Sequence, residues 1–345
     1  MKLLTASLLV AAGGFVVLGT TTYARAATMV DLELAFVIDG SSSTGPTAFE
    51  ANNLAYYNIF TNNFYRDVVQ PLAGKELAPG QIGTGKIAVA AYQFGQRLGI
   101  PTASPASPNA CNNDPVTGRE QCQAVDWTII ASQADANAFA DKILNLLKIG
   151  GGTPLGAGIR QATFGSQAFP NYDMPGIINN DIDSIRRIFD LASDGIFSPA
   201  GVPPELALVD PEIAARQAYD PSYCDPEDDS DPIFCNPSSI YSPDQGFEVL
   251  NIIGNPDGTP RPLENQDRID SLLEAFQGAT NLNGTPGRLF NPQTLGNPYQ
   301  EVLNEKILQE TQTPPVPPVS TPESSLALGL LSLGLLGIGS KLIQR

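Results

Sequence analysis

The feature that most constrains the fold is an apolar run that ends in a carboxylate and is followed by two hydroxyls. Residues 32–38 are apolar apart from Glu33, which is typical of a strand buried in a parallel sheet, and Asp39 follows them. Ser41 and Ser43 come next, at two-residue spacing. A carboxylate and two hydroxyls on one tight loop form half of an oxygen-lined cage for a hard divalent cation. The sequence therefore predicts a cation site at the carboxyl end of a buried strand.

Two downstream segments offer the remaining oxygens of such a cage. Residues 150–154 place Thr153 on a glycine loop, and residues 187–193 are typical of a second strand, which ends at Asp194. In doubly wound parallel sheets, ligands bind beyond the carboxyl ends of the strands, where the strand order reverses. Asp39 and Asp194 are both expected at such ends, so the sequence predicts that these segments meet.

In this order and at this spacing, the five residues resemble the metal-ion-dependent adhesion site of the von Willebrand factor A (VWA) family. The resemblance covers roughly residues 30–310 and is closest to a bacterial group of secreted VWA-like proteins of unknown function. It implies a VWA-like, Rossmann-like domain over this range. It also implies a set of metal-binding positions, which are Asp39, Ser41, Ser43, Thr153 and Asp194.

The same resemblance implies how the site would work. Ser41, Ser43 and Thr153 would contact the ion directly, and Asp39 and Asp194 would act through water. A small hydroxyl-rich cage favours Mg²⁺, with Mn²⁺ as the alternative. An open position on the ion would accept a carboxylate from a partner protein, so the expected function is metal-dependent protein binding or adhesion. Two alternatives stay open: a passive extracellular matrix or envelope component whose metal site is only structural, and a metal-dependent hydrolase.

Composition narrows the function classes. The chain contains no histidine, which excludes Ser-His-Asp and Cys-His mechanisms as well as histidine-based zinc sites. We therefore expect that the chain is not an enzyme. The formal net charge is −17, so nucleic acid is not an expected partner, because phosphate binding needs a basic surface.

Strand-like and helix-like runs alternate along the chain, which predicts an α/β fold. We expect a doubly wound, mostly parallel sheet with helices on both faces. Residues 97–101 and 125–130 are candidates for an edge hairpin, which would supply one antiparallel edge strand. Ser132 is expected to cap a helix. The other expected strands are 32–38, 87–94, 187–193 and 247–253, and the expected helices are 47–69, 134–147, 154–164, 204–218, 267–276 and 299–309.

The four cysteines fall into two pairs with equal spacing. In an exported chain this favours two local disulfides, Cys111–Cys122 and Cys224–Cys235, which would close the insertions 111–122 and 224–235. A zinc site is the alternative, although the usual close Cys-x-x-Cys spacing is missing. The second insertion carries a run of acidic residues over 225–231, which is either a Ca²⁺ site or a solvated charge run.

The amino-terminal residues 1–26 have the pattern of a secretory signal peptide. Lys2 supplies the positive charge, residues 3–18 are largely apolar, and Ala24-Arg25-Ala26 has the small-x-small form of a cleavage site. A membrane anchor is the alternative interpretation. The expected destination is outside the inner membrane.

The carboxyl-terminal end has a different organisation. A Pro-rich linker over 311–321 precedes a segment, 322–345, that resembles the PEP-CTERM sorting signal. That segment begins with Pro322-Glu323-Ser324, continues through a short apolar run that would form a transmembrane segment, and ends with basic residues. The resemblance implies a Gram-negative bacterium, an exosortase-type processing enzyme as a partner, and location at the cell envelope, on the outer surface or in the extracellular space. A plain tail anchor is the alternative, so membrane contact would be transient or lasting.

Overall fold

The computed structural model describes residues 27–102, 111–113, 118, 120–193, 198, 200–223, 245–253, 270–272, 274–275, 288–290 and 306–307. The predicted signal peptide, the Pro-rich linker and the sorting segment lie outside these residues. So do Asp194, the second cysteine pair and the acidic run 225–231. Within the described part of the chain, no helix combines the length and the apolar character that crossing a bilayer requires.

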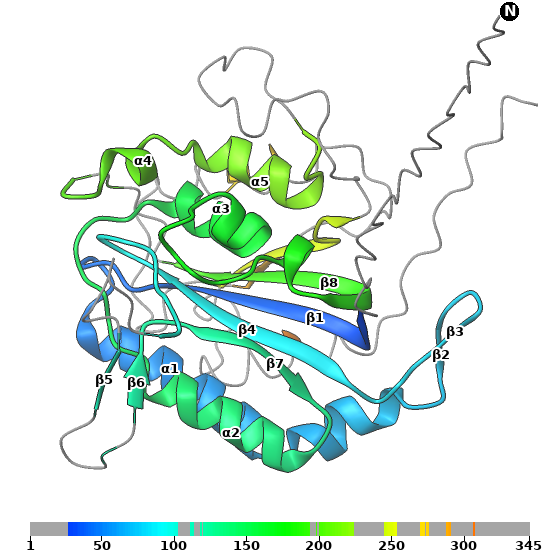
Figure 1. The fold of residues 1–345 in the computed structure, drawn as a ribbon. Coiled ribbons are helices and arrows are strands. Elements are labelled where there is room, and N and C mark those ends of the chain that lie inside the picture. The colour runs from blue at the N-terminus through cyan, green and yellow to red at the C-terminus, as the bar shows by residue number, and fades with distance from the viewer. Residues whose placement is uncertain are drawn as a thin grey trace, which may run out of the picture.

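A six-stranded sheet forms the centre of the molecule, with the strand order β10-β9-β8-β1-β4-β7 (Figure 1). Neighbouring strands are parallel except for β7, which runs antiparallel to β4 at the edge. The chain is therefore a mixed α/β protein with a mostly parallel sheet. The strands are β1 (Thr28–Asp39), β4 (Ile87–Phe94), β7 (Val125–Ile130), β8 (Ile182–Ala192), β9 (Val249–Ile253) and β10 (Arg288–Phe290).

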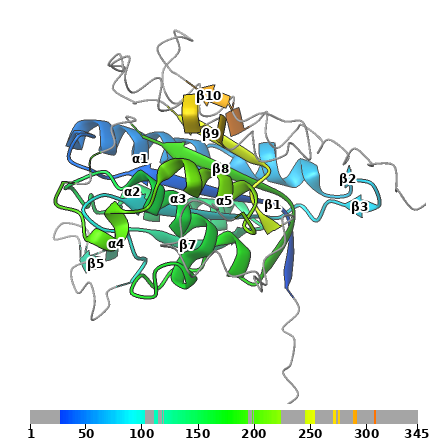
Figure 2. The same ribbon diagram turned by 90° about the horizontal axis from the view of Figure 1, so that it is seen from above.

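Helices cover both faces of this sheet. Figure 1 shows α1 and α2 below the strands and α3 and α5 above them, and Figure 2 gives the view from above. The alternation of side chains along β1 explains this arrangement: Leu34 and Phe36 belong to one apolar core, whereas Ala35 and Val37 belong to the other. The helices are α1 (Pro46–Thr61), α2 (Gln133–Leu144), α3 (Leu155–Phe164), α4 (Pro204–Ala207) and α5 (Pro211–Tyr219).

An aromatic cluster fixes β1 against the lower helices. The ring of Phe36 lies 4.6 Å from that of Tyr56 on α1 and 6.4 Å from that of Phe139 on α2, measured between centroids. All three side chains are fully buried. Burying a phenylalanine contributes about 1.5–3 kcal/mol, so this cluster holds the central strand firmly. The carboxyl end of β1 is thus a fixed platform for the loop that follows it.

Two expected helices are interrupted. The helix predicted over 47–69 ends at Thr61, because Asn63 adopts φ of +59°, which a right-handed helix does not accommodate. A π-helical turn, Tyr65–Val69, then follows. The helix predicted over 204–218 is divided into α4 and α5, because Asp210 caps a new helix by accepting hydrogen bonds from two backbone amides.

The edge hairpin was predicted with the wrong partner. Residues 97–101 form no strand, and Leu98 makes only an isolated bridge with Phe94. The antiparallel partner of β7 is β4 itself. Two short ribbons were not predicted: β2–β3 (Glu76–Ala78 and Gln81–Ile82), and β5–β6 (Cys111–Asn113 and Glu120–Cys122). The prediction of β4 over 87–94 is confirmed, and so is the cap formed by Ser132, which accepts a hydrogen bond from the Asp135 amide.

Candidate metal site

The candidate site lies where the strand order reverses. From β1 the chain continues to β4 on one side, and the later strand β8 lies on the other side. Asp39 at the end of β1 is in register with Phe94, and Ile38 is in register with Ala192. Ser193 therefore comes directly beside Asp39. Ligand sites of open α/β sheets are found at such positions.

The Asp39 carboxylate is held on both of its oxygens. Its Oδ1 accepts a hydrogen bond of 2.9 Å from the Ser41 amide, and its Oδ2 accepts one of 2.8 Å from the Ser193 hydroxyl. The hydroxyl oxygens of Ser41 and Ser43 are 2.8 Å apart. Asp39 and Ser41 are buried, whereas Ser43 is exposed. The oxygens thus lead from a buried floor to an open rim.

A glycine loop lies directly on this first loop. The Gly150 amide donates to the carbonyl of Gly40 over 2.7 Å, the Ser42 amide donates to the carbonyl of Gly151 over 2.8 Å, and the Gly151 amide donates to the Ser42 hydroxyl over 2.8 Å. Gly150 and Gly151 have φ of +75° and +76°, a conformation that favours glycine. Thr153 follows two residues later, and its side chain is buried. The two loops therefore form one bonded unit.

The segment before the glycine loop is fixed by a buried glutamine. The Gln93 side-chain amide donates to the carbonyl of Leu147 over 3.0 Å, and its Oε1 accepts a hydrogen bond of 2.8 Å from the Ile149 amide. Between them, the Lys148 ammonium donates to the carbonyl oxygen of Ser41. A lysine from a loop 107 residues further along the chain therefore contacts the candidate metal loop.

The structure brings together three of the five predicted residues through their hydrogen bonds. Asp39, Ser41 and Ser43 share one bonded loop, and Thr153 lies on the glycine loop bonded to it. Asp194 lies outside the described residues, although its neighbour Ser193 is bonded to Asp39.

Three polar residues near this site were not predicted. Ser193 could have been found from the strand end that pointed to Asp194. The Thr44 hydroxyl is buried and has no hydrogen-bond partner among the residues that the structure describes, so it adds an unsatisfied oxygen one residue after Ser43. Lys148 had no local signal, because its contact depends on the fold. Neutral hydroxyls with one carboxylate form a donor set that suits a hard cation rather than a soft one.

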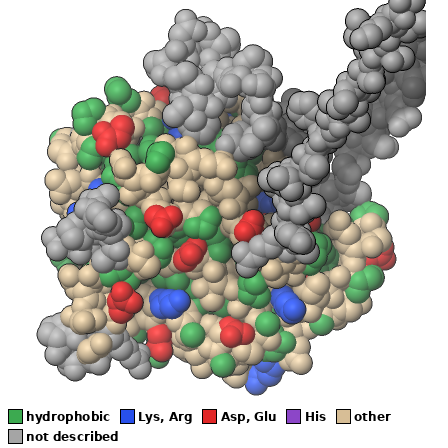
Figure 3. All heavy atoms as spheres, in the orientation of Figure 1, with side chains coloured by type: hydrophobic (Ala, Val, Ile, Leu, Met, Phe, Trp, Pro, Cys, Tyr) green, Lys and Arg blue, Asp and Glu red, His purple; other side chains and the backbone are tan. Residues whose placement is uncertain are grey.

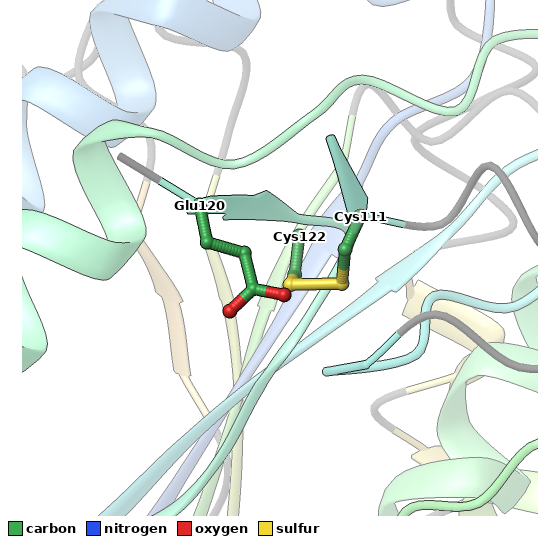
Figure 4. A group of neighbouring side chains, drawn as sticks. All are labelled: Cys111, Glu120 and Cys122. Carbon is green, nitrogen blue, oxygen red and sulfur yellow. A yellow bond between two sulfur atoms is a disulfide. The ribbon is translucent and has the colours of Figure 1, made fainter. Parts of the chain in front are cut away.

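A second group, Cys111, Glu120 and Cys122, has its potential metal-ligating atoms within 4.8 Å of one another (Figure 4). The two sulfur atoms, however, form the predicted Cys111–Cys122 disulfide, with an S–S distance of 2.07 Å. Metal ions bind the thiolate form of cysteine, which a disulfide does not offer. This group is therefore a crosslink between β5 and β6 in the structure.

The crosslinked ribbon borders a cavity of about 350 Å³. Glu120, Asp126 and Lys142 line it together with apolar residues. The pKa of Asp126 is raised above its ordinary value, mainly because the carboxyl group loses hydration. Figure 3 shows acidic and basic side chains interspersed over the drawn face of the molecule.

Glu33 and Asp190 are further buried carboxylates in the sheet. Glu33 on β1 accepts hydrogen bonds from Asn180, Ser184 and Arg187. Loss of hydration raises the pKa of Glu33, and the nearby Arg187 opposes that shift. Asp190 on β8 forms an ion pair with Lys306, and both side chains are fully buried. Lys306 connects the described carboxyl-terminal residues to the core.

Comparisons with known proteins leave the family of this chain open. No family model and no curated protein matches it. Two crystal structures of proximal thread matrix protein 1 from the mussel byssus are similar, at 15% and 16% identity and TM-scores of 0.34 and 0.35. The matches cover 82% and 83% of this chain but 48% and 47% of that protein, so the chain spans about half its length. A likeness this distant carries no argument about function.

Proposed function

We propose that this chain is an exported VWA-type protein that binds a partner protein through a shared divalent ion, Mg²⁺ or Mn²⁺. The observation that supports this most is the convergence of the Asp39 carboxylate with the Ser41 and Ser43 hydroxyls at the end of the central strand. That end lies where the strand order reverses, and the loop that carries Thr153 is bonded to it. Strand order, loop contacts and donor chemistry favour the same site.

In this proposal the ion is held by the oxygens of Asp39, Ser41, Ser43, Thr153 and Asp194. When bound, the ion would supply a Lewis-acidic position for a carboxylate of the partner. The residues of the chain do the rest: Ser193 and the Ser41 amide orient the Asp39 carboxylate, and the glycine loop keeps the donors in place. No covalent step is needed, so the protein acts as a binding module rather than as an enzyme.

The fold assignment is part of the same proposal. A doubly wound VWA arrangement agrees with helices on both faces and with an antiparallel strand at one edge of the sheet. The amino-terminal signal pattern and the PEP-CTERM-like end support export to the envelope or the cell surface of a Gram-negative bacterium. Intact-mass measurement of protein from the native host tests this part: removal of residues 1–26 and of the segment after about Pro322 is expected. A mature chain that still ends at Arg345 would reject processing at the carboxyl end.

A passive structural role is the second candidate. The bond between Ser193 and Asp39 and the bonds of the glycine loop already join three segments of the chain, so an ion at this place could act only to stabilise them. The two roles differ in one respect: only the adhesion role needs a partner that dissociates when the metal is removed.

Calorimetry with MgCl₂ or MnCl₂ tests the proposed site. The wild-type chain is expected to bind about one ion, and Asp39→Ala to weaken that binding strongly. Equal binding by the wild type and Asp39→Ala would reject the site. Capture of a partner from the native envelope, with and without EDTA, then separates adhesion from a purely structural role, because only adhesion predicts release by EDTA.

A further inference from the structure

One charge beside the candidate site has no place in the proposed donor set. The Lys148 ammonium donates a hydrogen bond to the carbonyl oxygen of Ser41, the residue between Asp39 and Ser43 in the proposed cage. Its side chain is half-buried. The lysine is not a loosely placed surface residue, because the backbone on both sides of it is fixed by Gln93.

The glycine loop strengthens this constraint. Gly150, two residues after Lys148, donates to the carbonyl of Gly40, and its own carbonyl accepts a hydrogen bond of 2.6 Å from the Gln96 amide. The segment therefore has little freedom to carry the ammonium away from the metal loop. The Lys148 ammonium thus contacts the backbone of a loop that is proposed to bind a doubly charged cation.

The charge of the Lys148 ammonium determines how it affects the binding of a divalent ion. Two like charges within one Debye length repel, and the repulsion is stronger where the surroundings are partly buried. An ammonium at this position should weaken divalent binding by about five- to thirtyfold relative to a neutral side chain. The same charge should attract an anion that approaches the ion, because the anion then faces two positive centres instead of one.

We propose that Lys148 sets the balance of the site: it lowers the affinity for the divalent ion and raises the affinity of the ion-loaded site for an acidic partner. This inference rests on the proposed metal site and specifies the chemistry of its partner, a segment that presents an Asp or Glu side chain. Lys148 acts on the ion and on the partner through its charge. It is a specificity-determining residue rather than a metal ligand.

The first test is Mg²⁺ calorimetry on the full chain at low ionic strength. Lys148→Met is expected to bind Mg²⁺ about five- to thirtyfold more tightly than the wild type. Lys148→Arg keeps the charge and is expected to stay within about twofold. Lys142→Met removes the same charge from α2, where Lys142 lines the cavity beside the crosslinked ribbon, and serves as the matched control, again within about twofold. The gain of Lys148→Met should shrink in 0.5 M KCl, because salt screens the repulsion.

The second test uses glutarate as the acidic probe, titrated into protein saturated with Mg²⁺ and followed by NMR. Lys148→Met is expected to bind glutarate several-fold more weakly than the wild type, and Lys142→Met to match the wild type. The opposite signs of the two effects distinguish this role from simple support of the loop, since a loosened loop would weaken both kinds of binding.

The outcomes separate this inference from the proposal on which it rests. If Lys148→Met leaves Mg²⁺ affinity unchanged or lowers it, while Asp39→Ala still weakens Mg²⁺ binding strongly, the role of Lys148 is overturned and the metal site stands. Glutarate binding equal to that of the wild type would overturn the part that concerns the partner. A wild-type chain that binds no Mg²⁺ would overturn both proposals.

Discussion

Glu33 and Asp39 lie six residues apart on β1, an even spacing that places both side chains on the same face of the strand. Both are buried. Glu33 lies in the body of the sheet, where the Arg187 guanidinium, the Ser184 hydroxyl and the side-chain amide of Asn180 all donate to it. Asp39 lies at the strand end, and its described hydrogen bonds come from an amide and a hydroxyl.

The difference shows that burial alone does not identify a functional acid. A charge inside a protein is costly unless it is paired and hydrogen-bonded. Glu33 meets this requirement within the fold, through a cation from the neighbouring strand β8. Asp190 does the same through Lys306. Asp39 lies at the strand end, where the Ser41 amide and the Ser193 hydroxyl donate to it and where the proposed divalent ion would add a further contact.

The largest expected effect concerns Glu33, the carboxylate that is paired within the sheet. Glu33→Ala should lower the free energy of unfolding by about 3–5 kcal/mol, because it leaves the Arg187 guanidinium in the sheet without one of its acidic partners. Asp39→Asn, which keeps the shape of the side chain, should change the stability of the metal-free protein by no more than about 1 kcal/mol. Urea unfolding in EDTA measures both. Similar losses of stability for the two variants would show that Glu33 and Asp39 do not differ in their contribution to folding.

The stability gained from Mg²⁺ binding should depend on Asp39 and not on Glu33. At an Mg²⁺ concentration of about 100 times Kd, the wild type should gain about 2.7 kcal/mol in unfolding free energy. Asp39→Asn should gain almost nothing, while Glu33→Gln should keep the full gain although its starting stability is lower. Unfolding curves with Mg²⁺ and with EDTA give these values. A metal response that depends on Glu33 as much as on Asp39 would contradict the assignment.

The serines that donate to the two carboxylates provide a finer test. Ser193→Ala removes the hydroxyl that orients Asp39, and it should weaken Mg²⁺ binding by about tenfold, as expected for a residue that supports a metal ligand. Ser184→Ala removes the corresponding hydroxyl from Glu33 and should leave Mg²⁺ affinity unchanged. Calorimetry compares the two variants directly. Equal losses would indicate a general effect on the sheet rather than a local one.

The smallest expected effect is a pH dependence. Loss of hydration raises the pKa of Glu33, so the folded chain binds this proton more tightly than the unfolded chain does. The stabilising contribution is therefore fully present below the ordinary pKa of glutamate and is lost as pH rises through the raised pKa. The slope should be a fraction of about 1.4 kcal/mol per pH unit.

Unfolding free energies of the wild type and Glu33→Gln, measured in EDTA over that range of pH, isolate this effect. Glu248 also has a pKa raised by loss of hydration, but its contribution cancels in the difference. The wild type should lose stability relative to Glu33→Gln as pH rises. A constant difference would show that Glu33 has the same pKa in the folded chain as in the unfolded chain.

Local signals of the sequence were sufficient for much of the architecture. The continuous apolar run gave the core of β1, and β4 was predicted with its observed bounds, because a buried strand needs apolar residues on both faces. The Ser132 cap was equally local. The division of the helix at Asn63 was missed, because a single left-handed residue does not disturb the apolar pattern around it.

For the candidate site, the sequence by itself determined the half that lies on one loop. Asp39, Ser41 and Ser43 are close because they are near in sequence, and the chain geometry of a strand end makes their oxygens converge. The sequence also placed Thr153 on a glycine loop, and the structure adds that Gly150 and Gly151 adopt φ near +75°, which favours glycine.

Only the tertiary structure decided which residues, distant in sequence, contact Glu33, Asp39 and the loop of Ser41. Ser193 is 154 residues from Asp39, Arg187 is 154 residues from Glu33, and Lys148 is 107 residues from Ser41. Each contact depends on the order and register of strands, which arise from the packing of the whole sheet against its helices. A hydrogen bond requires atoms to lie within about 3 Å, and no local pattern in a chain encodes a distance across so many residues.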